Sequence, residues 1–239
     1  TAASLGGLRD YANARVINGG TIEVTGGKHS SGNNFSVGAN GGTFRYNPAS
    51  TADTLTLSGN GNSNVPIAGA LTFQADGNIT VSEVIEGAGS LIKTGDQTVL
   101  LNRTDNSFSG NITVNAGTLT GIGNATSAGT TSAFGSKSSS RSITVKSGAT
   151  LWLTQTTGSS NTFGGSGMTA SQIPTLVIDG GSVYTGKFNT IGNVTMRNGG
   201  GLINSSQEPG GSYMAYQFIG DITVDGSGTG GTLSTRGKQ

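Results

Sequence analysis

Close pairs of acidic residues are the most direct sign of hydrolytic chemistry, because glycoside hydrolases use two carboxyl groups about 5 to 9.5 Å apart. The chain of 239 residues holds three pairs that lie close in sequence: Glu83 with Glu86, Asp96 with Asp105, and Asp221 with Asp225. Glu83 and Glu86 are three residues apart and face opposite sides of a strand. Asp221 and Asp225 bracket an apolar triplet and fit the solvated ends of a strand. No pair predicts a catalytic site by itself, so an enzyme is an alternative in which distant carboxylates converge.

The other common catalytic and metal-binding side chains are scarce. Cysteine is absent, and His29 is the only histidine. Thiol catalysis, disulfides and cysteine-bound metals are therefore excluded. A Ser-His-Asp arrangement would depend on His29, which we expect in a polar turn between Gly27 and Gly32. The glycine-aspartate repeat that binds calcium is missing, and the glycine run 226–231 lacks the Lys-Ser/Thr pair of a phosphate loop. We expect no catalytic, cofactor-binding or metal-binding residue.

One tryptophan is a candidate for binding. Trp152 stands between Leu151 and Leu153. Side chains alternate between the two faces of a strand, so Trp152 points outward if both leucines point into a core. An exposed indole is well suited to contact a sugar or a protein. We therefore name Trp152 as the first binding candidate.

The densest aromatic cluster lies near the C-terminal end of the sequence. It contains Tyr213, Tyr216 and Phe218. Tyr213 and Tyr216 are further binding candidates if their rings are exposed. Met214, Tyr216 and Phe218 also alternate, however, and that pattern is typical of a strand face packed in a core.

Composition narrows the class of protein. The chain has 43 glycines, about 18% of its residues against a usual 7%, and 10% charged residues against a usual 25% or so. The 13 basic residues are scattered singly, which argues against nucleic acid or an anionic membrane surface as a partner. No apolar stretch is long enough to span a bilayer, and Thr1 does not open a signal peptide, so we expect any export signal to lie outside this sequence.

A short phrase recurs along the chain, in which an apolar-Thr-apolar triplet is followed by a turn of Asn, Gly and Ser. The clearest copies are 112–119 and 143–151. The third residues of the triplets are Val81, Val114, Val145, Ile178, Met196 and Val224, at intervals of 33, 31, 33, 18 and 28 residues. Such intervals fit the coils of a β-solenoid that loops occasionally lengthen.

Each copy has a simple physical interpretation. Ile112 and Val114 share one face of a strand, and Thr113 points to the other. The chain then turns a sharp corner at 115–117, where Asn and Gly tolerate positive φ, and 118–119 begin the next strand. Short strands of this kind can stack as coils about 4.8 Å apart. The sequence thus predicts an all-β parallel β-helix, with Gly/Asn corners, over 1–239 as a single solenoid segment.

Two stretches lack strand signals and are predicted to protrude as loops, 124–141 and 154–171. The nearest approach to a helical period is 4–17, which Gly6 and Gly7 interrupt. A single short helix or turn is the most that this pattern supports.

Residues 87–119 resemble a known family, the passenger-associated transport repeats of bacterial autotransporters. The resemblance rests on four runs in order: Gly87–Gly95, Thr98–Leu101, Asn106–Gly110 and Ile112–Leu119. The stretches 132–136 and 143–151 are similar to the coil that commonly follows such a repeat, with 137–141 as an insertion. Asp96 and Gln97 stand where the family more often has small residues.

The resemblance implies a right-handed parallel β-helix that is part of an exported passenger. It also implies a C-terminal β-barrel translocator, which this sequence does not contain, so the chain is expected to be a fragment. The implied location is the Gram-negative cell surface or the extracellular space.

The function that follows from this interpretation is an adhesin, a self-association module for aggregation or biofilm, or a stalk, and not an enzyme. Partners would be a host or bacterial surface protein or glycan, bound along the lateral faces of the solenoid or by its loops. Two alternatives remain, a carbohydrate-active β-helix enzyme and a purely structural spacer.

Overall fold

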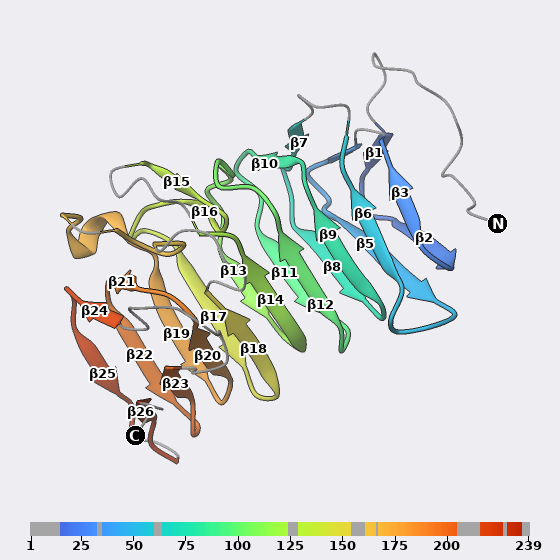
Figure 1. The fold of residues 1–239 in the computed structure, drawn as a ribbon. Helices are drawn as coiled ribbons and strands as arrows, with labels where there is room; N and C mark the ends of the chain where they lie inside the picture. The colour runs from blue at the N-terminus through green and yellow to red at the C-terminus, as the bar shows by residue number, and fades with distance from the viewer. Residues whose placement is uncertain are drawn as a thin grey trace.

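The computed structural model describes residues 15–32, 35–59, 64–123, 129–153, 161–165, 167–204, 216–226 and 229–235. These residues wind into an elongated stack of coils that runs from the N-terminal to the C-terminal end of the chain (Figure 1). Two long sheets line the stack, and a third side is made of short strand pairs and loops. The prediction of an all-β parallel β-helix is confirmed.

The first long sheet, here sheet I, contains nine parallel strands. In spatial order they are β2 (Thr21–Gly26), β5 (Gly42–Pro48), β8 (Leu71–Ala75), β11 (Leu91–Thr94), β13 (Ile112–Val114), β17 (Ser142–Lys146), β19 (Thr175–Asp179), β22 (Val194–Arg197) and β25 (Ile222–Val224). Spatial order follows chain order, as expected when each coil adds one strand.

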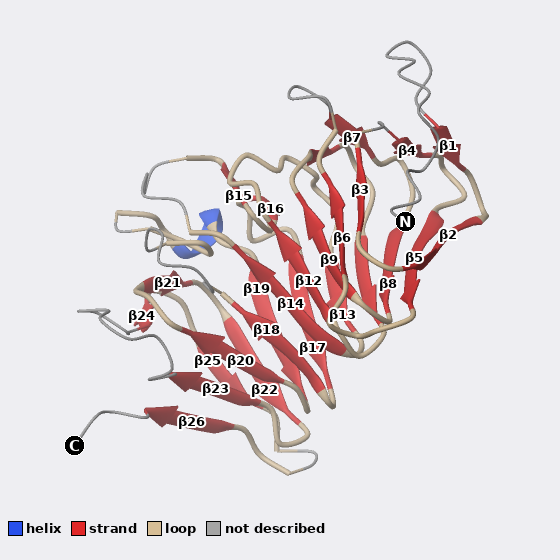
Figure 2. Cartoon of the chain, turned by 45° about the vertical axis from the view of Figure 1, so that its right-hand side comes forward, coloured by secondary structure: helices blue, strands red, loops and turns tan. Residues whose placement is uncertain are grey.

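The second long sheet, sheet II, also has nine parallel strands. They are β3 (His29–Ser31), β6 (Thr54–Leu57), β9 (Asn78–Val81), β12 (Thr98–Leu101), β14 (Gly117–Gly121), β18 (Ala149–Trp152), β20 (Ser182–Thr185), β23 (Gly201–Asn204) and β26 (Thr232–Thr235). The red strands of the two sheets run side by side along the stack in Figure 2.

The third side is less regular. It contains the parallel pairs β1 (Arg15–Ile17) with β4 (Phe35–Val37), β7 (Asn64–Pro66) with β10 (Val84–Glu86), and β21 (Asn189–Ile191) with β24 (Tyr216–Phe218). An antiparallel hairpin, β15 (Thr131–Ser132) with β16 (Gly135–Ser136), and a short 3₁₀ helix, η1 (Ala170–Gln172), complete the described elements.

Strand pairing confirms a coiled repeat and corrects one of its intervals. Five of the six triplet-ending residues form one continuous ladder in sheet I: Val114, Val145, Ile178, Met196 and Val224. Val81 lies instead in β9 of sheet II, so the predicted interval from Val81 to Val114 does not measure a coil. Leu71 pairs with Leu91, and Leu91 with Ile112, so these coils take 20 and 21 residues.

Inward side chains form one continuous core along the axis. In β17, Ile143 and Val145 are fully buried, while Thr144 is half-buried on the outer face. Burying an aliphatic side chain of this size stabilises the fold by roughly 1.5 to 3 kcal/mol. The gain is repeated coil by coil, which explains how a chain with few large apolar residues sustains a solenoid.

Glycines stack where successive coils turn onto sheet I. A Cβ added at Gly110 would lie 2.2 Å from the carbonyl oxygen of Gly89, and one at Gly89 would lie 2.1 Å from that of Gly69. No side chain fits at such distances, so these positions accept glycine alone. The close approach of the backbones keeps the coils in register at this corner.

The two stretches predicted to protrude are partly packed against the solenoid. Within 124–141, the side chains of Ala133, Phe134 and Arg141 are buried. Phe163, within 154–171, is buried as well and lies 6.4 Å from Phe134, between ring centroids. The described part of each stretch thus adds to the core on the third side. The helix or turn considered at 4–17 lies almost wholly outside the described residues.

Candidate functional site

An aromatic pair lies on the outer face of sheet II. Leu151 and Leu153 are fully buried, and Trp152 is partly exposed on the opposite face of β18. Trp152 pairs with Tyr184 of β20, which also faces outward. Neighbouring strands in a sheet lie about 4.8 Å apart, so the two aromatic side chains occupy adjacent positions on one surface. We call Trp152 and Tyr184 the aromatic pair.

Hydroxyl-bearing side chains border the aromatic pair. The outward position two residues before each aromatic residue forms a ladder across sheet II that includes Thr98, Thr118, Thr150 and Ser182. All four are partly exposed. Hydroxyl groups donate and accept hydrogen bonds, and aromatic rings offer an apolar face, so together they match the two-sided chemistry of a sugar ring.

On the side of β14, the neighbour of Trp152 is a buried residue. Thr120 of β14 pairs with Trp152 and is fully buried, although it occupies an outward position. Neither the Oγ1 of Thr120 nor the indole Nε1 of Trp152 has a hydrogen-bond partner among the described residues. Both polar atoms are shielded from solvent, so a ligand would contact the ring of Trp152 rather than its N–H.

The other aromatic candidates have different surroundings. Tyr213 lies outside the described residues. The hydroxyl of Tyr216 donates to the carbonyl oxygens of Ile203 at 2.9 Å and Val183 at 3.3 Å. Burial raises the pKa of Tyr216 far above its ordinary value, and the nearby Tyr184 adds to this shift. Tyr216 is partly buried and packs against the core.

The acidic pairs are dispersed. Glu83 is buried, whereas Glu86 faces outward and accepts a hydrogen bond from Asn64. Asp105 pairs with Arg103, at 2.7 Å between Nη2 and Oδ2, and this contact lowers the pKa of Asp105. No group of three or more His, Cys, Asp or Glu side chains that could hold a metal ion occurs in the described part of the chain.

His29 begins β3 and is mostly buried, rather than lying in the polar turn that the sequence favoured. Its Nε2 lies 2.8 Å from the carbonyl oxygen of Thr25, and its ring meets Tyr46 edge-on. The hydroxyl of Tyr46 donates to the carbonyl of Gly27 at 2.7 Å. These contacts give His29 a place in the core of the first coils.

Sequence reasoning missed a buried cation inside the region 87–119. Lys93 is fully buried and follows Leu91 on the inner face of β11. Its ammonium donates to the carbonyl oxygens of Thr94, Gly95 and Ala116 at 2.8, 2.7 and 3.0 Å. Burial lowers the pKa of Lys93 to about 8, against the opposing effect of Asp96 and Asp76. The three N–H groups match three acceptors, so the cation holds two successive corners together.

Arg141 has a similar role on the third side. Its Nε donates to the carbonyl of Gly110, and its Nη1 donates to those of Phe134 and Ser136. The guanidinium also lies 4.9 Å from the ring centroid of Phe108. Burial lowers the pKa of Arg141 to about 10. The stretch 129–141 is thereby tied to the preceding coil.

Glu83 is a buried carboxyl group with unusual surroundings. It lies between Val81 and Ile85 on the inward face, and neither carboxyl oxygen has a hydrogen-bond partner among the described residues. Burial raises the pKa of Glu83 to about 7, and the nearby backbone N–H of Gly59 opposes this in part. Among the described residues, no charged side chain contributes to this shift of the Glu83 pKa. The alternation of 81, 83 and 85 was the available signal for this burial.

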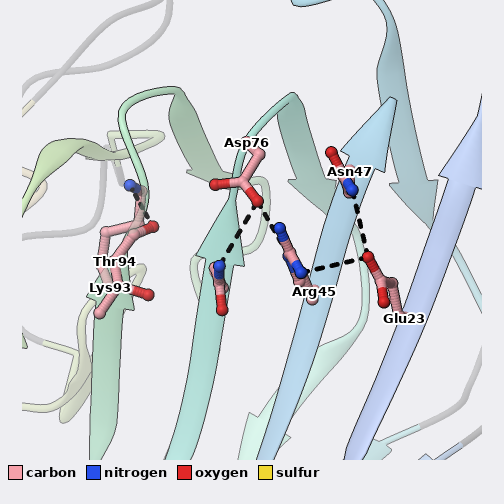
Figure 3. Close-up of polar contacts among 7 residues, drawn as sticks. Glu23, Arg45, Asn47, Asp76, Lys93 and Thr94 are labelled. Atoms are coloured by element: carbon pink, nitrogen blue, oxygen red, sulfur yellow. Dashed lines mark hydrogen bonds and ion pairs between the residues drawn. The ribbon is translucent and has the colours of Figure 1, made fainter. Parts of the chain in front are cut away.

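The outer face of sheet I carries a ladder of polar residues. Near its N-terminal end, Arg45 contacts Glu23 at 3.3 Å and Asp76 at 2.9 Å, and Asn47 donates to Glu23 (Figure 3). These exposed contacts cross three coils. Surface pairs of this kind each contribute little to stability.

A second group of charges lies on sheet I toward the C-terminal end. Asp179 contacts Lys146 at 2.6 Å and Arg197 at 3.2 Å, and Asn198 donates to its other oxygen. These three hydrogen bonds hold the pKa of Asp179 well below its usual range. Asp179 is therefore charged at neutral pH and bridges the coils on either side.

Comparison with known proteins finds a similarity over about half of the chain. The chain is 34% identical over 126 residues to the adhesin BmaC autotransporter of Brucella suis biovar 1 (strain 1330). The match covers 48% of this chain and 4% of that much longer protein. Family models and solved structures give no match. Among the described residues, no helix is long and apolar enough to cross a membrane.

Proposed function

We propose that this chain is a segment of an autotransporter passenger that is exported to the cell surface and serves in adhesion. The observation that carries the proposal is the similarity to an autotransporter adhesin over about half of the chain. The parallel β-helix supports it, because a stack of coils extends away from an anchor and presents long lateral faces.

The organisation proposed for the chain follows from the same function. Residues 1–239 form one solenoid segment, and 87–119 are its passenger-associated repeat. The stretches 124–141 and 154–171 are proposed to carry the surface variation. A C-terminal β-barrel translocator completes the full protein.

The binding surface that we propose is the outer face of sheet II at the aromatic pair. Trp152 and Tyr184 offer apolar ring surface, and the hydroxyl ladder beside them offers hydrogen bonds. A surface glycan or glycoprotein is the partner that best fits this chemistry. Tyr213 and Tyr216, the other two binding candidates from the sequence, remain proposed contributors to binding near the C-terminal end.

The test is binding of the purified chain to a glycan array and to fixed epithelial cells. We expect Trp152→Ala and Tyr184→Ala each to weaken binding about tenfold or more, which corresponds to roughly 1.4 kcal/mol. Ile92→Ala is the matched control, because Ile92 is a partly exposed apolar residue on the outer face of sheet I. Equal losses in all three variants would argue against this surface.

The same assay separates the alternatives. Depolymerisation of any polysaccharide on the array, lost in Asp221→Asn or Asp225→Asn, would support a carbohydrate-active enzyme. Clumping of beads coated with the chain, without binding to cells, would support self-association. Absence of all three activities would support a spacer.

A further inference from the structure

Two buried cations lie at one corner on the third side of the solenoid. Lys137 follows the hairpin β15–β16, and Arg141 directly precedes β17. Lys137 is 9% exposed and Arg141 is 3% exposed. Lysine and arginine are almost never buried to this extent unless other groups compensate the charge. Two cations at one buried corner therefore require a source of compensation.

The hydrogen bonds of Arg141 are incomplete. Its Nε and Nη1 donate to the carbonyl oxygens of Gly110, Phe134 and Ser136. Its Nη2 is shielded from solvent and has no partner among the described residues. The guanidinium carbon lies 4.9 Å from the ring centroid of Phe108, but an aromatic face is a weaker acceptor than an oxygen atom. One end of the guanidinium is thus left for a further acceptor.

The ammonium group of Lys137 has fewer partners still. Its Nζ is shielded from solvent and makes no hydrogen bond within the part of the chain that the structure describes. Burial lowers the pKa of Lys137, as it does that of Arg141, and none of the described carboxylates contributes to either shift. Lys93, by contrast, donates to three carbonyl oxygens. Lys137 therefore lacks the acceptors that make the buried charge of Lys93 tolerable.

The backbone directs Lys137 and Arg141 into the same corner. The N–H of Lys137 donates to the carbonyl of Thr130 at 2.8 Å, which extends the hairpin by one residue. Gly135 and Lys137 are buried, whereas Ser136 between them is partly exposed, so Gly135 and Lys137 face the same side of the strand. A Cβ added at Gly135 would lie 2.7 Å from Nη1 of Arg141. Lys137 therefore faces the side on which the guanidinium lies.

A tight turn joins the two cations along the chain. The N–H of Arg141 lies 3.5 Å from the carbonyl oxygen of Ser138, and the N–H of Ser140 donates to the hydroxyl of Ser138 at 3.2 Å. The N–H of Ser139 donates to the carbonyl of Ser171 at 3.0 Å, which ties the turn to η1. Figure 2 shows η1, in blue, close to the hairpin. The backbone of this corner is thus held in place without the free donors of the two cations.

One anion would compensate both cations at once. Two like charges repel each other more strongly in a place that is shielded from water, and an anion supplies both negative charge and acceptors. We propose that this corner binds a small inorganic oxyanion, with the size and charge of sulfate or hydrogen phosphate. The ammonium of Lys137 and Nη2 of Arg141 hold it. We call these two residues the anion site.

The chemistry of the two donors favours an oxyanion. A guanidinium binds oxyanions with a planar set of N–H groups, and an ammonium adds a compact point charge with three further donors. Both free donors are shielded from solvent, which favours a compact free anion over the sulfate group of a polymer, because the attached sugar would have to enter the corner as well. The anion site is separate from the aromatic pair, and its test does not depend on glycan binding.

Isothermal titration calorimetry and thermal melts test the anion site. The purified chain is compared in sodium sulfate and in sodium chloride of the same ionic strength. We expect one saturable site for sulfate, and a Tm that rises by about 3 °C or more at ten times the dissociation constant. Sulfate also stabilises folded proteins in general. Lys28→Met is therefore the matched control, because Lys28 is exposed and its loss leaves the anion site intact.

Lys137→Met is expected to lose the heat of sulfate binding and the saturable rise in Tm, with an unchanged circular dichroism spectrum. Arg141 is kept in this variant because it holds the corner to the preceding coil. Without sulfate, Lys137→Met should be at least as stable as the unsubstituted chain, since methionine removes a buried charge with little change in volume. This second measurement separates loss of the site from misfolding.

Three results would overturn the proposal. One is an absence of sulfate binding in the unsubstituted chain, or equal binding in Lys137→Met and Lys28→Met. Another is binding of a sulfated oligosaccharide without binding of free sulfate, which would make the ligand a glycan. The third is a lower Tm of Lys137→Met in buffer without sulfate, which would give the ammonium of Lys137 a partner within the chain.

Discussion

The ammonium group of Lys93 donates a hydrogen bond to the carbonyl oxygen of Ala116, 3.0 Å away in the next coil. The same group also donates hydrogen bonds to the carbonyl oxygens of Thr94 and Gly95 in its own coil. A cation thus takes the place of an apolar side chain in the ladder between Phe73 and Val114 and links two corners.

Lys93→Met is expected to lower the free energy of unfolding by roughly 2 to 3 kcal/mol, because it leaves three backbone carbonyls without their donor in a buried place. Urea denaturation followed by circular dichroism measures the change. Lys28→Met is the control, since Lys28 is exposed. If both variants unfold at the same urea concentration, the link between corners does not stabilise the fold.

Glu83 is expected to make stability depend on pH. Its pKa is about 7 in the folded chain and near 4.5 when unfolded, so the unfolded chain loses its proton first as pH rises. The contribution of Glu83 to stability is then greatest below about pH 4 and falls by up to roughly 3 kcal/mol as pH rises from 4.5 to 7. Glu83→Gln should remove this fall.

The measurement is urea denaturation at several pH values between 4 and 8. Glu86→Gln is the matched control, because Glu86 faces outward and bonds to Asn64. A slope that persists in Glu83→Gln would assign the pH dependence to other groups.

Gly110→Ala is expected to destabilise the chain by several kcal/mol or to prevent folding, because the new Cβ would meet the carbonyl of Gly89 at 2.2 Å. Gly20→Ala should have little effect, since nothing lies within 4 Å of a Cβ there. Thermal melts of the two variants give the comparison. Equal melting temperatures would mean that the backbone at the stacked glycines shifts to accommodate the added methyl group at little cost in stability.

Arg141→Ala is expected to release the stretch 129–141 from the preceding coil, because it removes the donor to Gly110, Phe134 and Ser136. Limited proteolysis should cut this stretch at least tenfold faster, while the urea midpoint falls by a smaller amount. Arg103→Ala is the control, because Arg103 is partly exposed and, in the part of the chain that the structure describes, forms its ion pair with Asp105. An unchanged cleavage rate would show that the packing of Phe134 and its neighbours is enough to hold this stretch against the solenoid.

The burial of Arg141 and Phe134 also guides experiments on the loops. Deleting all of 124–141 would remove core and anchor together, so a loss of binding in that variant would report misfolding. Deleting 124–128 alone keeps the hairpin β15–β16, so that variant tests a contribution of 124–128 to binding without removing Phe134 or Arg141.

Local alternation was enough to determine the fold class and many facing directions. The period of two in Ile112, Thr113 and Val114 fixes which residues face the core, and the glycines mark the corners. The repeat also predicted stacking, because Val114 and Val145 do pair. These features depend on residues close in sequence, which explains why they were predictable.

The aromatic pair was decided by the tertiary structure. Trp152 and Tyr184 are far apart in the sequence. They become neighbours only because β18 pairs with β20. The same holds for Val81, whose triplet looks like the others but lies in sheet II. Insertions change the length of a coil without changing its register, so intervals in sequence do not reveal which strands pair.

The buried charged residues show most clearly what the sequence determines and what the tertiary structure decides. Side-chain alternation indicates inward positions for Lys93 and Glu83, whereas their charge favours the surface. The sequence alone does not decide between these two indications. Packing decided the outcome, because the carbonyls of Thr94, Gly95 and Ala116 converge on Lys93 only when two coils are stacked. The alternation of side chains between the two faces is determined by the sequence alone. The hydrogen-bond partners that make an inward charge tolerable are supplied by the neighbouring coil.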